Sequence, residues 1–386
     1  MKYFYPSFIY LLILCIVTTV ACHRESQVIP TGDSASVSNG EGTLEERIKA
    51  TKDGDVITLK SGKYNLDKRL VIDREITIRG ETSEKVILTS SDSCVFEISF
   101  GSPIFENLTV ISDSEDERSA ALLITGGSPK LQSCAISSYH GTGIHVSQKE
   151  TAPEVRDCTI KECGGSGILV ENYACGTFVN CDIYGNQSDE IVVKNNANPT
   201  FLNCRIHEGK TVGIAVSQKG RGIFLDCDIY GHTPMEIMIS SYSTPVFQKC
   251  KIHDGTFGVG VIQMSLGTFE ECDIFGHLLA GVATNLGGAP IFSKCKIRDG
   301  KGMGIFIREP GLGSFSYCDI FGNENGVYIS NSGSLFLGKC QIHDQRKCGI
   351  LAEKQANAHI DSCDIYKNTE AGIHITDSSK LHVSAC

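Results

Sequence analysis

Aromatic and basic side chains alternate at one position of a repeated unit, and they are the residues of this sequence best suited to bind a ligand. Each lies three residues after a cysteine: Tyr184, His207, Tyr230, His253, Phe275, Arg298, Phe321, His343 and Tyr366. Aromatic rings offer flat apolar faces, and His and Arg offer hydrogen bonds at a regular spacing. An extended polysaccharide or protein segment would fit such a track. The alternative is that outward aromatic residues only stabilise the fold by packing on one another.

The same spacing argues against metal binding and catalysis. The histidines recur at every second unit, about 9.6 Å apart at the spacing of neighbouring strands, which is too far to share one metal ion. Glu190 and Glu236 are also two units apart, near the upper limit of about 9.5 Å for the carboxyl groups of an inverting glycosidase. Because surface glutamates are far commoner than catalytic ones, we predict no catalytic residue, no metal site and no cofactor.

The elements that position these side chains are marked by a repeated Cys-x-Ile. Its cysteines recur every 22 to 24 residues: Cys134, Cys158, Cys181, Cys204, Cys227, Cys250, Cys272, Cys295, Cys318, Cys340 and Cys363. Each period holds three apolar segments that are too short for helices, such as 200–202, 204–207 and 213–216. The sequence therefore predicts an all-β fold, a single-stranded, right-handed parallel β-helix with rungs of about 22–24 residues.

Alternation along each strand predicts which columns form the core. Seven phenylalanines lie three residues before a cysteine: Phe178, Phe201, Phe224, Phe247, Phe269, Phe292 and Phe315. The same count places Ile104 in this column and Asn107 at the cysteine position of an early rung. Stacked cysteines would hold their Cβ atoms near the strand spacing of about 4.8 Å, beyond the roughly 3.8 Å of a disulfide. We therefore predict that the cysteine column consists of buried free thiols.

The ends of the chain differ from the repeats. Residues 1–21 have one lysine and an apolar run from Phe8 to Val20, which is typical of an export signal. Thr19-Val20-Ala21-Cys22 resembles a lipobox, so we expect lipidation at Cys22 and a tether over 22–42; ordinary cleavage after Ala21 is the alternative. Thr43 and Glu46 have capping-box spacing and predict a helix to about Lys52 that covers the first rung. We expect residues 43–386 to form the β-helix domain. Its C-terminal edge is expected either to be open to end-to-end self-association or to be naturally blunt.

The charge composition limits the classes of partner that the protein is expected to bind. The formal net charge is −10 and the basic residues are dispersed, whereas nucleic-acid binding needs clustered Lys and Arg. We predict no nucleic-acid partner, and contact with a membrane only through the lipid anchor.

The repeats, as in PTFLNCRIHEGKTVGIAVSQKGRGIFLDCDIYGH, resemble right-handed β-helices of the pectate-lyase-like superfamily, of the NosD-like or F-box-associated type. The resemblance spans about residues 43–386 and implies recognition of carbohydrate or protein. The signatures Asn-Thr-Asp, Asp-Asp and Gly-His-Gly of polygalacturonase-like members are missing, as is the Asp-Pro-His of alginate epimerases. We therefore predict an exported, lipid-anchored, non-catalytic scaffold that binds a glycan or protein at the cell envelope. The alternative is a polysaccharide lyase, epimerase or hydrolase with an unrecognised site.

Overall fold

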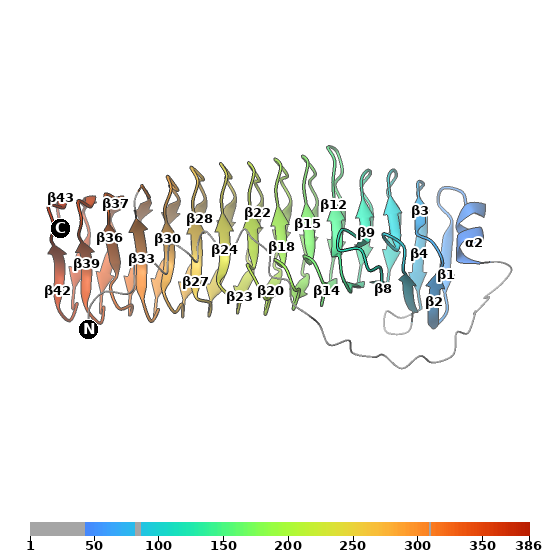
Figure 1. Cartoon of the computed structure of the whole chain (residues 1–386), viewed down its shortest axis with the longest axis horizontal. Helices are drawn as coiled ribbons and strands as arrows, with labels where there is room; N and C mark the ends of the chain where they lie inside the picture. Colours follow the sequence, from blue (N-terminus) through green and yellow to red (C-terminus); the bar gives the residue numbers. More distant parts are fainter. Residues whose placement is uncertain (1–42, 82–85, 309) are drawn as a thin grey trace. The chain divides into compact units, whose positions relative to one another are not determined.

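The computed structural model describes residues 43–81, 86–308 and 310–386. In this part of the chain, one short helix precedes three parallel β-sheets, here called sheets A, B and C, through which the chain passes in turn (Figure 1). Each circuit contributes one strand to each sheet. The all-β parallel β-helix expected from the sequence is confirmed.

The strands of each sheet follow one another in chain order. Sheet A contains β1 (Val56–Leu59), β4 (Thr77–Gly80), β7 (Ile104–Glu106), β10 (Lys130–Gln132), β13 (Glu154–Arg156), β16 (Thr177–Val179), β19 (Thr200–Leu202), β22 (Ile223–Leu225), β25 (Val246–Gln248), β28 (Thr268–Glu270), β31 (Ile291–Ser293), β34 (Ser314–Ser316), β37 (Ser334–Gly338), β40 (Asn357–Asp361) and β43 (Lys380–Ser384). Sheet B contains β2 (Gly62–Leu66), β5 (Val86–Ser90), β8 (Thr109–Ser112), β11 (Ala135–Ser138), β14 (Thr159–Lys161), β17 (Asp182–Tyr184), β20 (Arg205–His207), β23 (Asp228–Tyr230), β26 (Lys251–His253), β29 (Asp273–Phe275), β32 (Lys296–Arg298), β35 (Asp319–Phe321), β38 (Gln341–His343) and β41 (Asp364–Tyr366). Sheet C contains β3 (Leu70–Ile72), β6 (Phe96–Ile98), β9 (Ala120–Ile124), β12 (Thr142–Val146), β15 (Ile168–Val170), β18 (Ile191–Val193), β21 (Ile214–Val216), β24 (Met235–Ile239), β27 (Phe257–Val261), β30 (Ala280–Thr284), β33 (Met303–Arg308), β36 (Val327–Ser330), β39 (Cys348–Ala352) and β42 (Ala371–Ile375).

The register places equivalent residues of successive rungs side by side. Phe201 pairs with Phe178 on one side and with Phe224 on the other. The seven predicted phenylalanines are fully buried and stack with ring centroids 4.4–5.1 Å apart and interplanar angles of 3–8°. Each ring therefore removes apolar area from water and also cross-links neighbouring rungs.

The cysteine column lies in the same core. Its members from Cys134 to Cys363 are buried, and every cysteine of the described residues is free, so the predicted thiol column is confirmed. The Sγ of Cys250 donates to the carbonyl oxygens of Phe224, at 3.4 Å, and Gln248, at 3.5 Å. Buried thiols thus obtain hydrogen bonds from the backbone without any disulfide.

One early rung corrects the predicted register. Phe105 pairs with Leu131, whereas Ile104 pairs with the outward Lys130. Leu108 is buried and precedes β8 as Cys134 precedes β11, while Asn107 has a φ of 55° in the turn. The prediction that Ile104 and Asn107 take the core positions was wrong by one residue, because Asn107 occupies the turn position that Ser133 occupies before Cys134, and Leu108 takes the core position of the cysteine.

The helix predicted at the N-terminal end of the domain is confirmed. Helix α2 (Leu44–Ala50) begins with a capping box between Thr43 and Glu46, and it buries Leu44 and Ile48. Figure 1 shows α2 beside β1 at one end of the strand stack. Its two apolar side chains therefore cover a strand edge that would otherwise be exposed.

At the other end, the edge strands β41, β42 and β43 carry exposed residues that include Ile375 and Val383. That this edge pairs with another molecule stays a prediction. Within the described residues no helix is long and apolar enough to cross a membrane. The predicted signal segment 1–21, the tether 22–42 and Cys22 lie outside the described residues.

Candidate binding surfaces

The predicted aromatic and basic column runs along the outer face of sheet B, with one member at the end of each strand from β17 to β41. The register brings neighbouring members together, as in the pairing of Tyr230 with His207 and His253. The Tyr, His and Phe rings that adjoin one another have centroid separations of 4.6–5.3 Å and interplanar angles of 5–13°. Because each such ring covers the face of its neighbour, mainly the ring edges remain for a ligand.

The basic members of this column are held by carboxylates. The Nε2 of His253 lies 3.1 Å from Asp228 of the preceding rung, and its Nδ1 lies 2.9 Å from Asp254. His343 and Arg298 lie between two aspartates in the same way. The column is therefore a stack whose charges are largely neutralised within the protein. That Tyr184, His207, Tyr230, His253, Phe275, Arg298, Phe321, His343 and Tyr366 bind a ligand stays a prediction.

Glu190 and Glu236 are not on the surface, which corrects the prediction made for them. Both are completely buried: Glu190 lies directly before β18, and Glu236 is the second residue of β24. Glu190 accepts hydrogen bonds from the backbone and side-chain amides of Asn186, and Glu236 is paired with the ring of His232. Burial raises the pKa of Glu190 to about 7 and also raises the pKa of Glu236. Neither carboxyl group can reach a polysaccharide substrate.

Glycines of the following rungs make room for these two carboxyl groups. A Cβ atom at Gly209 would lie 2.5 Å from Oε1 of Glu190, and one at Gly255 would lie 2.2 Å from Oε1 of Glu236. Gly209 and Gly255, each in the rung after its glutamate, therefore leave the space that the two carboxyl groups occupy.

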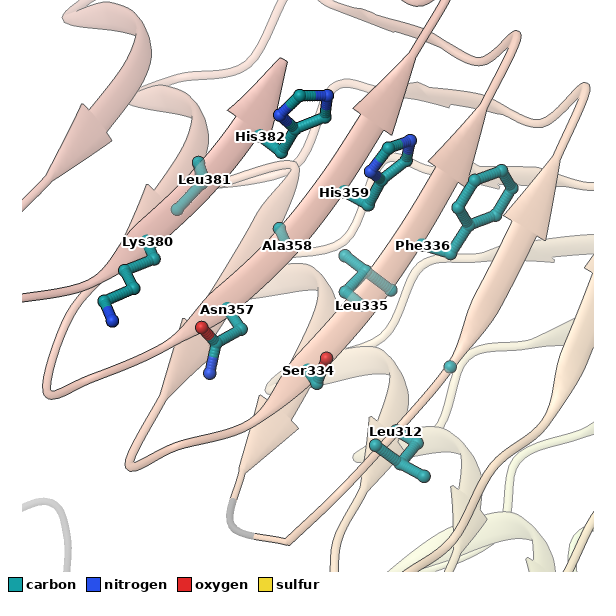
Figure 2. Close-up of a pocket in the computed structure, with 11 residues that line it drawn as sticks. Leu312, Ser334, Leu335, Phe336, Asn357, Ala358, His359, Lys380, Leu381 and His382 are labelled. Carbon is teal, nitrogen blue, oxygen red and sulfur yellow. The ribbon is translucent and has the colours of Figure 1, made fainter. Parts of the chain in front are cut away.

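A groove of about 550 Å³ lies on the outer face of sheet A, over β37, β40 and β43 and the two residues that precede β34. Figure 2 shows two rows of side chains along it: Phe336, His359 and His382 form one, and Ser334, Asn357 and Lys380 form the other. Leu335, Ala358 and Leu381 lie between the rows, and Leu312 lies toward β34. The groove thus combines an aromatic ring, apolar groups and hydrogen-bonding groups.

The rings of the first row stack along the sheet. Phe336 and His359 have centroids 5.7 Å apart, and His359 and His382 have centroids 4.8 Å apart. On the other side, Phe336 pairs with Ser314 of β34, which has no ring. Phe336 is 39% exposed, so one of its faces is left free of a stacking partner.

The sequence analysis missed this groove. The outward position four residues before each cysteine holds Thr or an aliphatic residue from Thr200 to Ile291, then Ser314, and changes to Phe336, His359 and His382 in the final rungs. This change of residue type at a constant position was the available signal.

Comparisons with known proteins agree with this architecture. A family model described as "Right handed beta helix region" matches residues 86–244, 191–335 and 291–386. The catalytic domain of a GH87 alpha-1,3-glucanase in complex with nigerose is 10% identical, with a TM-score of 0.52 over 92% of this chain and 71% of that chain. The Agl-KA catalytic domain is 13% identical, with a TM-score of 0.54 over 85% of this chain and 62% of that one.

At these identities the structural likeness concerns the fold alone. The family model covers residues 86 to 386 through three overlapping matches, which is well over half of the chain. Together with the three parallel sheets, it confirms the right-handed parallel β-helix that the repeats indicate. This chain belongs to the right-handed β-helix family.

Proposed function

We propose that this protein is a non-catalytic β-helix scaffold that binds a glycan in the groove of sheet A. The observation that carries the proposal is the free face of Phe336 beside a row of hydrogen-bonding side chains. Sugars pack their apolar faces on aromatic rings while their hydroxyl groups need polar partners. Nigerose bound to the similarly folded GH87 domain makes a sugar a reasonable first ligand class. A protein segment is the other ligand class that the repeats suggest.

The groove is a better contact surface than the column on sheet B. In the column most ring faces are covered, and His253 and His343 each lie between two carboxylates. A ligand would have to displace these interactions, whereas in the groove it would fill open space. Binding therefore costs less reorganisation in the groove.

Binding is also favoured over catalysis by the chemistry of the groove. Glycoside hydrolysis needs a pair of carboxyl groups flanking the scissile bond. None of the eleven residues that line the groove is Asp or Glu, and Glu190 and Glu236 are buried. A polysaccharide lyase, epimerase or hydrolase remains the alternative that the following experiment separates.

The test is an array of neutral and acidic polysaccharides incubated with the protein and read for both retention and new reducing or unsaturated ends. We expect retention without product, and we expect Phe336→Ala to weaken binding about tenfold, which corresponds to about 1.4 kcal/mol. Ile291→Ala is the matched control, because Ile291 has the same outward position two rungs away. Product formation, or retention that is unaffected by Phe336→Ala, would contradict the proposal.

Tyr230→Ala in the same array examines the predicted column. If Tyr230→Ala abolishes retention while the variant stays folded and Phe336→Ala does not, the ligand binds on sheet B instead of in the groove.

We further propose that the protein is exported and lipid-anchored at the cell envelope through Cys22. The support is the apolar segment that ends in Thr19-Val20-Ala21-Cys22. Cells that express the chain and are fed radiolabelled palmitate should yield labelled protein in the membrane fraction. Cys22→Ala should lose the label. Loss of the membrane association is also expected. Unlabelled protein cleaved after Ala21 would instead establish ordinary secretion.

A further inference from the structure

Three basic side chains gather in the groove, although the chain as a whole is acidic. Lys380 and His382 lie on β43 and His359 lies on the neighbouring β40, and all three are exposed. The formal net charge of the chain is −10, and no carboxylate lines the groove. The local charge of the groove is therefore opposite to that of the whole protein.

These basic groups differ from those of sheet B in their partners. His253 and His343 each have two carboxylates within 4 Å. In the described part of the chain, neither Lys380 nor His359 nor His382 forms an ion pair within that distance. Two sets of outward histidines thus occur in the same fold, one neutralised by the protein and one left for a partner from outside.

The nearest carboxylate on the same strand is already occupied. Asp361 lies two residues after His359 on β40, and its oxygens accept hydrogen bonds from Ser384 Oγ, at 2.7 Å, and Ser362 Oγ, at 3.1 Å. These bonds hold the pKa of Asp361 below its usual value. Asp361 is therefore an anion that is satisfied by serines, and it leaves the two imidazoles of the groove without a hydrogen-bonded counter-ion.

From this charge pattern we infer that the glycan bound in the groove is acidic, with a carboxylate or sulfate group placed against His359, His382 and Lys380. This inference rests on the proposed function and names the ligand class of the same site. Phe336 takes the apolar face of the sugar ring, and Asn357 and Ser334 take its hydroxyl groups. Charge-assisted hydrogen bonds to an anion are the strongest that these side chains can form.

The arrangement of the histidines also predicts how binding depends on pH. The two rings are stacked 4.8 Å apart, so two imidazolium groups would repel each other in the free protein. Histidine changes its charge between about pH 5 and 8, and an anion beside both rings favours their protonated forms. Lys380 lies beside the pair on β43, and Asp361 on β40 interacts electrostatically with His359; the hydrogen bonds from Ser384 and Ser362 hold the pKa of Asp361 below its usual value, so that this carboxylate stays charged over the range. Affinity should therefore rise as the pH falls from 8 to 5.5.

The experiment is calorimetric titration of the full chain with matched pairs of oligosaccharides: a uronic-acid trisaccharide and its methyl ester, and a sulfated glucan trisaccharide and its unsulfated form. We expect one acidic member to bind at least tenfold more tightly than its neutral counterpart, and to bind more tightly at pH 5.5 than at pH 8. The preferred pair identifies the anion as a carboxylate or a sulfate.

Substitutions distinguish the contribution of the basic groups to affinity from the contribution of the Phe336 ring. Lys380→Ala and the double variant His359→Gln/His382→Gln should reduce the affinity for the acidic sugar to that of its neutral partner, whereas Phe336→Ala should weaken both. Lys251→Ala, on the outer face of sheet B, is the control and should change neither. All of these side chains are exposed, so the variants are expected to fold, which circular dichroism verifies.

If acidic and neutral sugars bind with equal affinity and Phe336→Ala still weakens both, the inference that the glycan is acidic is overturned while the proposed function stands. Absence of binding to every sugar by the folded protein would overturn both. Binding only to acidic peptides, tested in the same titration, would also overturn the glycan while assigning the groove to a protein partner.

Discussion

Replacing Phe247 by Ala is expected to lower the free energy of unfolding by about 3–5 kcal/mol. Phe247 is fully buried in the core column, and its ring stacks on Phe224 at 4.6 Å and on Phe269 at 4.9 Å. The substitution would remove the apolar area of one ring and leave a cavity between two others. It would also break two aromatic contacts, each worth about 0.5–1.5 kcal/mol beyond burial.

Urea denaturation followed by circular dichroism measures this loss, and Val246→Ala is the matched control. Val246 is the preceding residue of β25 and points outward, with 37% of its surface exposed. Its replacement should cost less than about 1 kcal/mol. Equal destabilisation by the two substitutions would show that the phenylalanine column does not dominate the cohesion between rungs.

The second large effect concerns pH and the buried Glu190. Its pKa is about 7 in the folded protein, above the ordinary value of 4.5, because burial disfavours the charged carboxylate. A raised pKa means that the folded state holds the proton more tightly than the unfolded chain. The stabilisation by the neutral carboxyl group is therefore fully present below about pH 4.5 and is lost as the pH rises through 7.

Glu190→Gln should remove this dependence. At about 1.4 kcal/mol per pKa unit, the wild-type protein should lose at most about 3 kcal/mol between pH 4.5 and 8 relative to the variant. The test rests on how the free energy of unfolding changes with pH, not on its absolute value. Gln keeps the shape of a neutral carboxyl group, but it presents a second amide to Asn186 at every pH. The measurement is the urea midpoint at a series of pH values.

Other titrating groups set the controls for this experiment. Burial raises the pKa of Glu236 and so adds a slope of the same sign, whereas it lowers the pKa of His277 to about 4, so that His277 destabilises the fold only as the pH falls. Both contributions remain in the variant and cancel in the comparison. Glu208→Gln is the matched control, because its side chain is 70% exposed. An unchanged slope in Glu190→Gln would show that Glu190 is ionised in the folded state.

The repeat was sufficient to predict the fold, since a period near 23 residues with three short apolar segments admits few other architectures. The buried phenylalanine and cysteine columns were predicted because side chains alternate strictly across a strand, so that one identified core residue assigns the rest. The capping helix was predicted from Thr43 and Glu46, whose effect is local. The early rung was misplaced by one residue because Asn107 was aligned with the cysteines, whereas it takes the turn position that Ser133 and Asn203 hold in later rungs.

The surface and the turns could not be predicted in the same way. Alternation assigns Tyr230 and His253 to the outer face, but only the tertiary structure shows that their rings cover one another and that Asp228 holds the imidazole. Glu190 seemed a surface residue because a turn has no alternation, and the space that Gly209 leaves for its carboxyl group belongs to the next rung.

The sequence by itself thus determined the rung and, apart from the early rung of Asn107, the register and the core, since these depend on spacing along the chain. The tertiary structure alone decided which polar groups are neutralised and where a groove opens. Phe336, His359 and Lys380 lie on three different strands, and their common environment depends on distances between rungs that no single repeat contains.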